Sequence, residues 1–145
     1  EGCVLAVDIG TTTVVLVLLD LQTGNVLLEK SFLNPQRRYG SDVISRIQHA
    51  HEKGPTLLQE LLLKGLRAQL KAVENKDIRR MCVCGNAVMT HLFLGIDLYH
   101  WQLHHMSVYK RSWSFVHQNS FFRILYRNLR YRFYLRFPHM LVVIF

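Results

Sequence analysis

With 145 residues, the chain is long enough for one domain with a hydrophobic core and too short for two. Its apolar runs are shorter than the roughly 18 residues of a membrane span, and its three cysteines lack disulfide-like spacing, so we expect a cytoplasmic protein without transmembrane helix or signal peptide. The net charge of +8 would favour nucleic acid or an acidic membrane, but residues 1–97 carry eleven Lys/Arg against ten Asp/Glu, which excludes a uniformly basic protein.

The first third of the chain predicts three β-strands joined by tight turns. Residues 3–9 and 13–19 are rich in Val, Ile and Leu, and residues 10–12 between them suit a turn. A second turn at residues 23–25 leads into a strand over residues 26–33, which Asn34-Pro35 ends. We expect these three strands to pair antiparallel.

Helical spacing follows. Ser41 is the expected N-cap, with Asp42 in the first turn, of a helix that Gly54-Pro55 ends and whose apolar positions are Val43, Ile44, Ile47 and Ala50. Thr56 and Gln59 then have the spacing of a capping box. They precede an apolar stripe made of Leu57, Leu58, Leu61, Leu62, Leu66, Leu70 and Val73. Two separate helices and one long helix broken at the proline both fit.

A fourth strand is expected over residues 78–84, and Gly85-Asn86 opens a short helix over residues 87–94 that Gly95 closes. Cys82 and Cys84 would share one face of that strand, as small buried hydrophobes or as ligands of a soft metal. Antiparallel strands followed by a helix-linked, parallel strand predict an α/β fold, with helices on a mixed sheet of five or fewer strands.

The residues most informative about chemistry lie between the first two strands. Asp8 ends a buried strand, and Gly10, Thr11, Thr12 and Thr13 follow it. A carboxylate there can hold Mg²⁺ through water, glycine lets the backbone approach a phosphate closely, and the turn amides and hydroxyls can donate to its oxygens. An ordinary hairpin with β-forming threonines is the alternative.

This hairpin resembles the first phosphate loop of the acetate kinase, sugar kinase, Hsp70 and actin superfamily. Three spaced motifs within residues 3–97 narrow the resemblance to the ATPase domain of reductive activators of corrinoid proteins. They are Asn34-Pro35-Gln36 with Tyr39-Gly40 and residues 42–47, then Gly85-Asn86 with Met89 and His91-Leu92, and finally residues 94–97.

The resemblance implies the ribonuclease-H-like half of an actin-like ATPase domain. It also implies a homodimeric parent that couples hydrolysis of Mg-ATP to reduction of Co(II) to Co(I) on a corrinoid protein or corrinoid-dependent methyltransferase. By position, Asp8 takes the catalytic, Mg²⁺-side role, and Gly10, Thr11, Thr12 and Thr13 cradle the phosphates. For residues 34–40 two alternatives stay open: they reach the nucleotide or a partner, or they form a turn that only positions the sheet. For Gly85-Asn86 the alternatives are that it faces the cleft or that it only caps a helix. The family's [2Fe–2S] cluster belongs to a full-length parent and not to this chain.

The sequence departs from this pattern after residue 97. Residues 98–145 hold seven Lys/Arg, thirteen of sixteen aromatics and no Gly, Ala, Thr, Asp or Glu, so we expect residues 1–97 to be half of an ATPase domain and residues 98–145 an out-of-frame or disordered tail. The second half of the nucleotide site, which needs glycines, would be missing, and the fragment would be inactive alone. Two alternatives stay open: a small-molecule kinase of the same superfamily, and a basic module that binds nucleic acid or membrane through the tail, although we expect neither partner.

Overall fold

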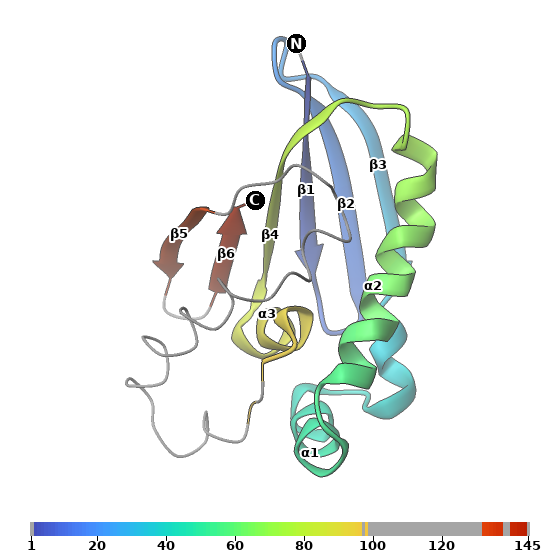
Figure 1. The fold of residues 1–145 in the computed structure, drawn as a ribbon, viewed down its shortest axis with the longest axis vertical. Coiled ribbons are helices and arrows are strands. Elements are labelled where there is room, and N and C mark those ends of the chain that lie inside the picture. Colours follow the sequence, from blue (N-terminus) through green and yellow to red (C-terminus); the bar gives the residue numbers. More distant parts are fainter. Residues whose placement is uncertain (1, 97, 99–131, 138–139, 145) are drawn as a thin grey trace.

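The computed structural model describes residues 2–96, 98, 132–137 and 140–144, which form one mixed sheet with helices beside it (Figure 1). The strands are β1 (Cys3–Ile9), β2 (Thr13–Asp20), β3 (Val26–Leu33), β4 (Ile78–Asn86), β5 (Arg132–Phe137) and β6 (Met140–Ile144). The helices are α1 (Val43–Lys53), α2 (Thr56–Leu70) and α3 (Ala87–Leu94), with short 3-10 helices η1 (Pro35–Tyr39) and η2 (Lys71–Val73). None of the helices described here is long and apolar enough to cross a bilayer.

Strand β1 organises the sheet, whose order is β3-β2-β1-β4-β6-β5. It pairs antiparallel with β2 and parallel with β4, while β2 pairs antiparallel with β3. Between β3 and β4 the chain passes through α1 and α2, since a parallel neighbour requires a crossover connection. The predicted mixed α/β fold is confirmed, and so is the order of its strands and α-helices as far as α3, with α1 and α2 as two separate helices.

Residues 1–97 contribute four strands, within the five or fewer predicted for the half domain, and two further strands from residues 132–144 extend the sheet to six. Strand β6 pairs antiparallel with β4, and β5 pairs antiparallel with β6. Both come from the segment expected to be a tail, where aromatic and branched residues suit a strand. Residues 99–131 lie outside the described residues, so the domain boundary after residue 97 and the out-of-frame or disordered tail stay predictions.

The core lies between one face of the sheet and the helices. Alternate side chains of β1, β2 and β4 are buried on this face, as the period of a strand requires. They form one cluster with apolar residues of α2 and α3, namely Leu5, Val7, Ile9, Val14, Leu16, Leu18, Met81 and Val83 with Leu58, Leu62, Leu66, Met89, Leu92 and Phe93. Each fully buried Leu or Phe contributes about 1.5–3 kcal/mol, so this face stabilises the sheet.

The start of α1 differs from the prediction by one residue. Asp42, not Ser41, is the N-cap, because its carboxylate accepts from the backbone N–H of Ser45 at 2.9 Å and the Ser45 hydroxyl accepts from the Asp42 N–H. The Ser41 hydroxyl donates to the Asp42 carboxylate instead. The stripe of α1 also differs, since Ile44 is 68% exposed.

Helix α2 is separate from α1 and begins after Pro55 without a side-chain cap, so the predicted capping box of Thr56 and Gln59 is wrong. The Gln59 amide instead donates to the carbonyl oxygen of Phe93 in α3 at 3.0 Å, which draws it into the core. In the apolar stripe of α2, Leu57 was expected to be buried but is exposed, whereas Leu63 is buried.

Candidate functional site

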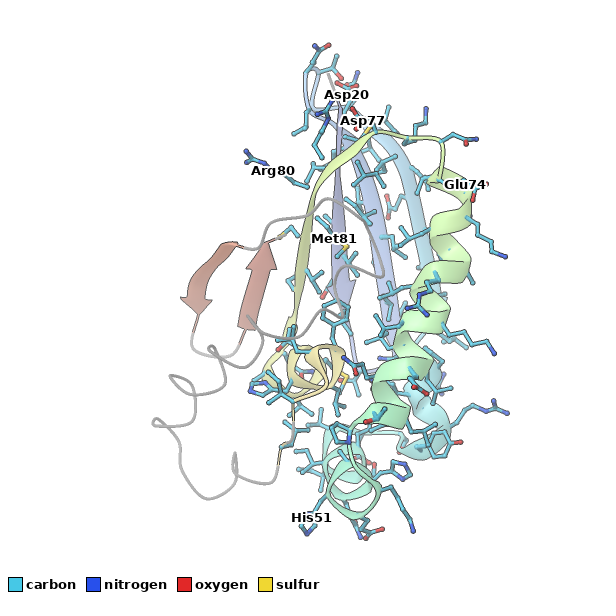
Figure 2. All side chains as sticks on the ribbon, in the orientation of Figure 1. Asp20, His51, Glu74, Asp77, Arg80 and Met81 are labelled. Atoms are coloured by element: carbon cyan, nitrogen blue, oxygen red, sulfur yellow. The ribbon has the colours of Figure 1, made fainter. Side chains whose placement is uncertain are left out.

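The two ends of the sheet differ in chemistry. At one end, turns carry Asp20 and Asp77, which bond locally to Thr23 and Arg79 (Figure 2). At the other end, next to α1 and α3, the loop between β1 and β2 meets the loop after β3 and the junction of β4 with α3 (Figure 1). The predicted phosphate loop thus meets Asn34 and Asn86 at this second end, where the candidate site lies.

The hairpin loop, residues 10–13, closes tightly. The backbone N–H of Gly10 donates to the carbonyl oxygen of Thr13 at 3.0 Å. A Cβ atom on Gly10 would overlap that same oxygen, so no larger residue fits this turn. Thr11 is half-buried, whereas Thr12 and Thr13 are exposed. The predicted phosphate-loop residues are therefore brought together, with two of the threonine side chains open to solvent.

Three consecutive carbonyl groups of this loop point into the protein. That of residue 10 accepts from the side-chain amide of Asn34 at 2.9 Å, and that of residue 12 accepts from the backbone N–H of Asn34 at 2.8 Å. Between them, the carbonyl of Thr11 accepts from Nη2 of Arg46 at 2.6 Å. Because a trans peptide directs its C=O and the following N–H to opposite sides, the amides of residues 11–13 face outward. Successive amides directed to one side suit an anion.

Asp8 lies beside this loop on the sheet face that points away from the helices. Its side chain is exposed, and it alternates with the buried Val7 and Ile9. Its partner in β4 is Cys84. Its position at the end of β1, close in sequence to the outward amides, is the one predicted for a Mg²⁺-side carboxylate.

Cys82 and Cys84 share the face of Asp8, where both are half-buried, less than was expected of small buried hydrophobes. The other face of β4 is the one that packs on the helices. Burial, followed by the charge of Asp8, raises the pKa of Cys84 to about 11, so the thiol is protonated at neutral pH. Within the described ranges no three His, Cys, Asp or Glu side chains come together as a metal site.

The junction of β4 and α3 touches the hairpin loop through Asn86. Its Oδ1 accepts from the backbone N–H of Met89 at 2.9 Å and caps α3, and its Nδ2 donates to Thr11 Oγ1 at 3.3 Å. Gly85 permits this approach, because a Cβ there would lie 2.8 Å from the carbonyl oxygen of Ile9. Of the two alternatives for Gly85-Asn86, helix capping is confirmed, and Asn86 in addition contacts the hairpin loop.

The segment of residues 34–40 lies behind the loop and supports it. Asn34 and Gln36 are buried at 1% and 0% exposure, and the Gln36 amide donates to the carbonyl oxygen of Leu58 at 2.9 Å. The Asn34 Oδ1 accepts from the Gln36 N–H, which caps η1. The polar residues of this segment nearest the loop thus point inward and position it.

Arg46 is the site residue that sequence reasoning missed. It is 0% exposed, and besides Thr11 it donates through Nε to the carbonyl oxygen of Gly40 at 3.0 Å. Burial lowers the pKa of this guanidinium from its ordinary value. The signal was present, because Arg46 lies three residues after Val43 and four before Ala50, on the buried stripe of α1.

Comparison with known proteins shows which family the chain resembles. Residues 3–124 match the model of a family described as the RACo middle region. The chain is 40% identical over 105 residues to the corrinoid activation enzyme RamQ of Eubacterium limosum, an overlap of 66% of this chain and 18% of that protein. A solved structure of a reductive activator for corrinoid, iron-sulfur protein is similar with a TM-score of 0.64 and 44% identity over 71% of this chain. The chain spans 18% of the length of each relative.

Proposed function

The chain belongs to the family of the RACo middle region, and from this premise we propose that it supplies the phosphate-binding half of an ATPase site in a reductive activator of corrinoid proteins. The observation that carries the proposal is the inward direction of three consecutive carbonyls at residues 10–12. It leaves consecutive amides facing outward beside Asp8, an arrangement suited to phosphate oxygens with a metal ion alongside.

The described residues fit Mg-ATP. Gly10 has no Cβ to fill the turn, the amides and hydroxyls of Thr11, Thr12 and Thr13 would donate to phosphate oxygens, and the exposed carboxylate of Asp8 would hold Mg²⁺ through water. In this role Asp8 is the catalytic residue of the chain, because it orients the metal ion against the phosphates. Bound Mg-ATP would supply the free energy for the uphill reduction of Co(II) to Co(I).

The fold supports an actin-like half domain. The order β3-β2-β1-β4, with β1 and β4 parallel and helices on one face, supports the ribonuclease-H-like half that the resemblance implies. In this proposal a second half of the parent closes over the nucleotide, so the chain alone does not turn over ATP. The parent is a homodimer that carries the [2Fe–2S] cluster, and its partner is a corrinoid protein or a corrinoid-dependent methyltransferase.

A chimera tests the function. The matching segment of the E. limosum relative would be replaced by residues 3–96 of this chain, and the ATP-dependent appearance of Co(I) corrinoid followed by absorbance. We expect reduction by the chimera, its loss on Asp8→Asn, and no effect of Asp20→Asn at the opposite end of the sheet. A folded Asp8→Asn chimera that reduces as fast as its parent would contradict the proposal.

A further inference from the structure

Arg46 is a buried cation without a buried anion. All of its side chain is inaccessible to solvent, and among the described residues an ion pair joins Arg79 to Asp77 but none joins a carboxylate to Arg46. A buried charge is costly unless hydrogen bonds satisfy it, so the groups that the guanidinium contacts indicate the task of Arg46. The nearest charged group on its own helix, Asp42, is exposed and caps α1.

The hydrogen bonds of Arg46 show where that task lies. Nη2 donates to the carbonyl oxygen of Thr11 at 2.6 Å, the shortest of its contacts, and Nε donates to that of Gly40 at 3.0 Å. Nη1 contacts Gln36 Oε1 at 3.4 Å and Met89 Sδ at 3.1 Å. One rigid planar group therefore ties the hairpin loop to η1, α1 and α3.

We propose that Arg46 is the positioning residue of the phosphate loop: by holding the Thr11 carbonyl inward, it holds the Thr12 amide outward, toward the phosphate. This inference rests on the proposed function for the identity of the anion. The positive charge of Arg46 acts through the peptide that joins Thr11 to Thr12. A cation next to the carbonyl side of this peptide favours a negative charge next to its amide side.

The close approach of Gly40 supports the assignment. A Cβ on Gly40 would lie 2.9 Å from the backbone nitrogen of Arg46 and 3.0 Å from its Cγ. A residue larger than glycine would push the arginine out of its place under the loop. Gly40 and Arg46 are thus parts of one support for the loop.

The experiment uses the full chain and compares wild type with Arg46→Lys, Arg46→Met and the exposed control Arg38→Met. Lysine keeps the charge and can reach one of the two carbonyls, whereas methionine keeps only the volume. Without nucleotide, ¹⁵N relaxation gives the order parameters of residues 10–13 and, as internal reference, of the turn at residues 20–25 at the opposite end of the sheet. Titration with Mg-ATP then gives the affinity.

In both Arg46 variants we expect the order parameters of Thr11 and Thr12 to fall from about 0.85 toward the flexible range below about 0.6. The reference turn and Arg38→Met should stay as in wild type. Mg-ATP affinity should fall about fivefold or more in Arg46→Met, the loss of one hydrogen bond of ordinary strength, with partial rescue in Arg46→Lys.

An unchanged loop, equal loosening at both ends of the sheet, or unfolding of both Arg46 variants would overturn the proposal, since each makes Arg46 a residue of general stability. The two claims fail separately. A wild-type chain that binds no Mg-ATP but whose loop loosens in Arg46→Lys refutes the nucleotide site and keeps the positioning role. An Arg46 variant that binds Mg-ATP tightly and keeps a rigid loop would refute the positioning role and keep the nucleotide site.

Discussion

The side-chain amide of Asn86 bonds to two segments at once: it caps α3 through the N–H of Met89 and reaches the hydroxyl of Thr11, 75 residues earlier in the chain. The two contacts use different atoms of the same amide. Substitutions that keep the oxygen and change the nitrogen therefore separate stability from binding.

Asn86→Asp should keep the cap and weaken the binding of Mg-ATP. A carboxylate still accepts from the Met89 N–H, so the free energy of unfolding should stay within about 0.5 kcal/mol of wild type. Beside Thr11, however, it replaces a donor with a negative charge and repels phosphate. Asn86→Ala should instead lose about 1 kcal/mol of stability. Urea denaturation and Mg-ATP titration measure both, and an Asp variant that binds as tightly as wild type would place Asn86 outside the site.

The N-cap of α1 gives two neighbouring residues, Asp42 and Ser41, different expected effects on stability. Asp42→Ala should lower the free energy of unfolding by about 1 kcal/mol, because it leaves the Ser45 N–H without its acceptor. The matched substitution Ser41→Ala should change it by less than about 0.5 kcal/mol, since Ser41 lies outside the helix. Urea denaturation measures both, and a larger effect at Ser41 would restore the cap expected from the sequence.

Alanine substitutions at Gly95 and Gly24 separate the cost of backbone strain from the cost of a steric clash. Both have positive φ, 68° and 72°, so alanine is strained at either position by about 1 kcal/mol. A Cβ on Gly95 would also meet the Gln59 amide, with Oε1 2.5 Å away, whereas a Cβ on Gly24 meets nothing within 4 Å. Thermal denaturation should therefore show a larger loss for Gly95→Ala, and equal losses would mean that Gln59 moves freely.

His91 should make stability depend on pH. Burial lowers its pKa in the folded state, and its contact with the Ala87 carbonyl only partly opposes this. The unfolded chain takes up the proton near pH 6.5, so stability present above that pH should fall as pH drops through about 6.5 toward the lower folded value. His91→Gln should flatten this slope, while His51→Gln, at an exposed position of α1 (Figure 2), should keep it. Urea denaturation between about pH 5 and 8 measures this pH dependence of the free energy of unfolding. If His91→Gln leaves the slope unchanged, the pH dependence comes from another residue.

Much of the site was predictable because it is local in the chain. Runs rich in Val, Ile and Leu predicted β1 and β2, and the residue types of Gly10 and Asn86 already predicted a tight turn and a helix start. The hydrogen-bond partners of Arg46 and Gln36 were not predictable, because these partners, at Thr11 and Leu58, are distant in sequence. Gln59 likewise left its predicted cap for the Phe93 carbonyl. Strands β5 and β6 were missed because composition does not show that β4 has an edge left to pair.

The most direct test of the site is a Mg-ATP titration of the full chain followed by ¹⁵N–¹H NMR spectra, which detect even weak binding. We expect the amide signals of residues 11–13 to shift most, omission of Mg²⁺ to weaken the shifts, and Asp8→Asn to abolish them without changing the unfolding transition. Shifts confined to other parts of the chain, or the same shifts of residues 11–13 in Asp8→Asn, would contradict the proposed site.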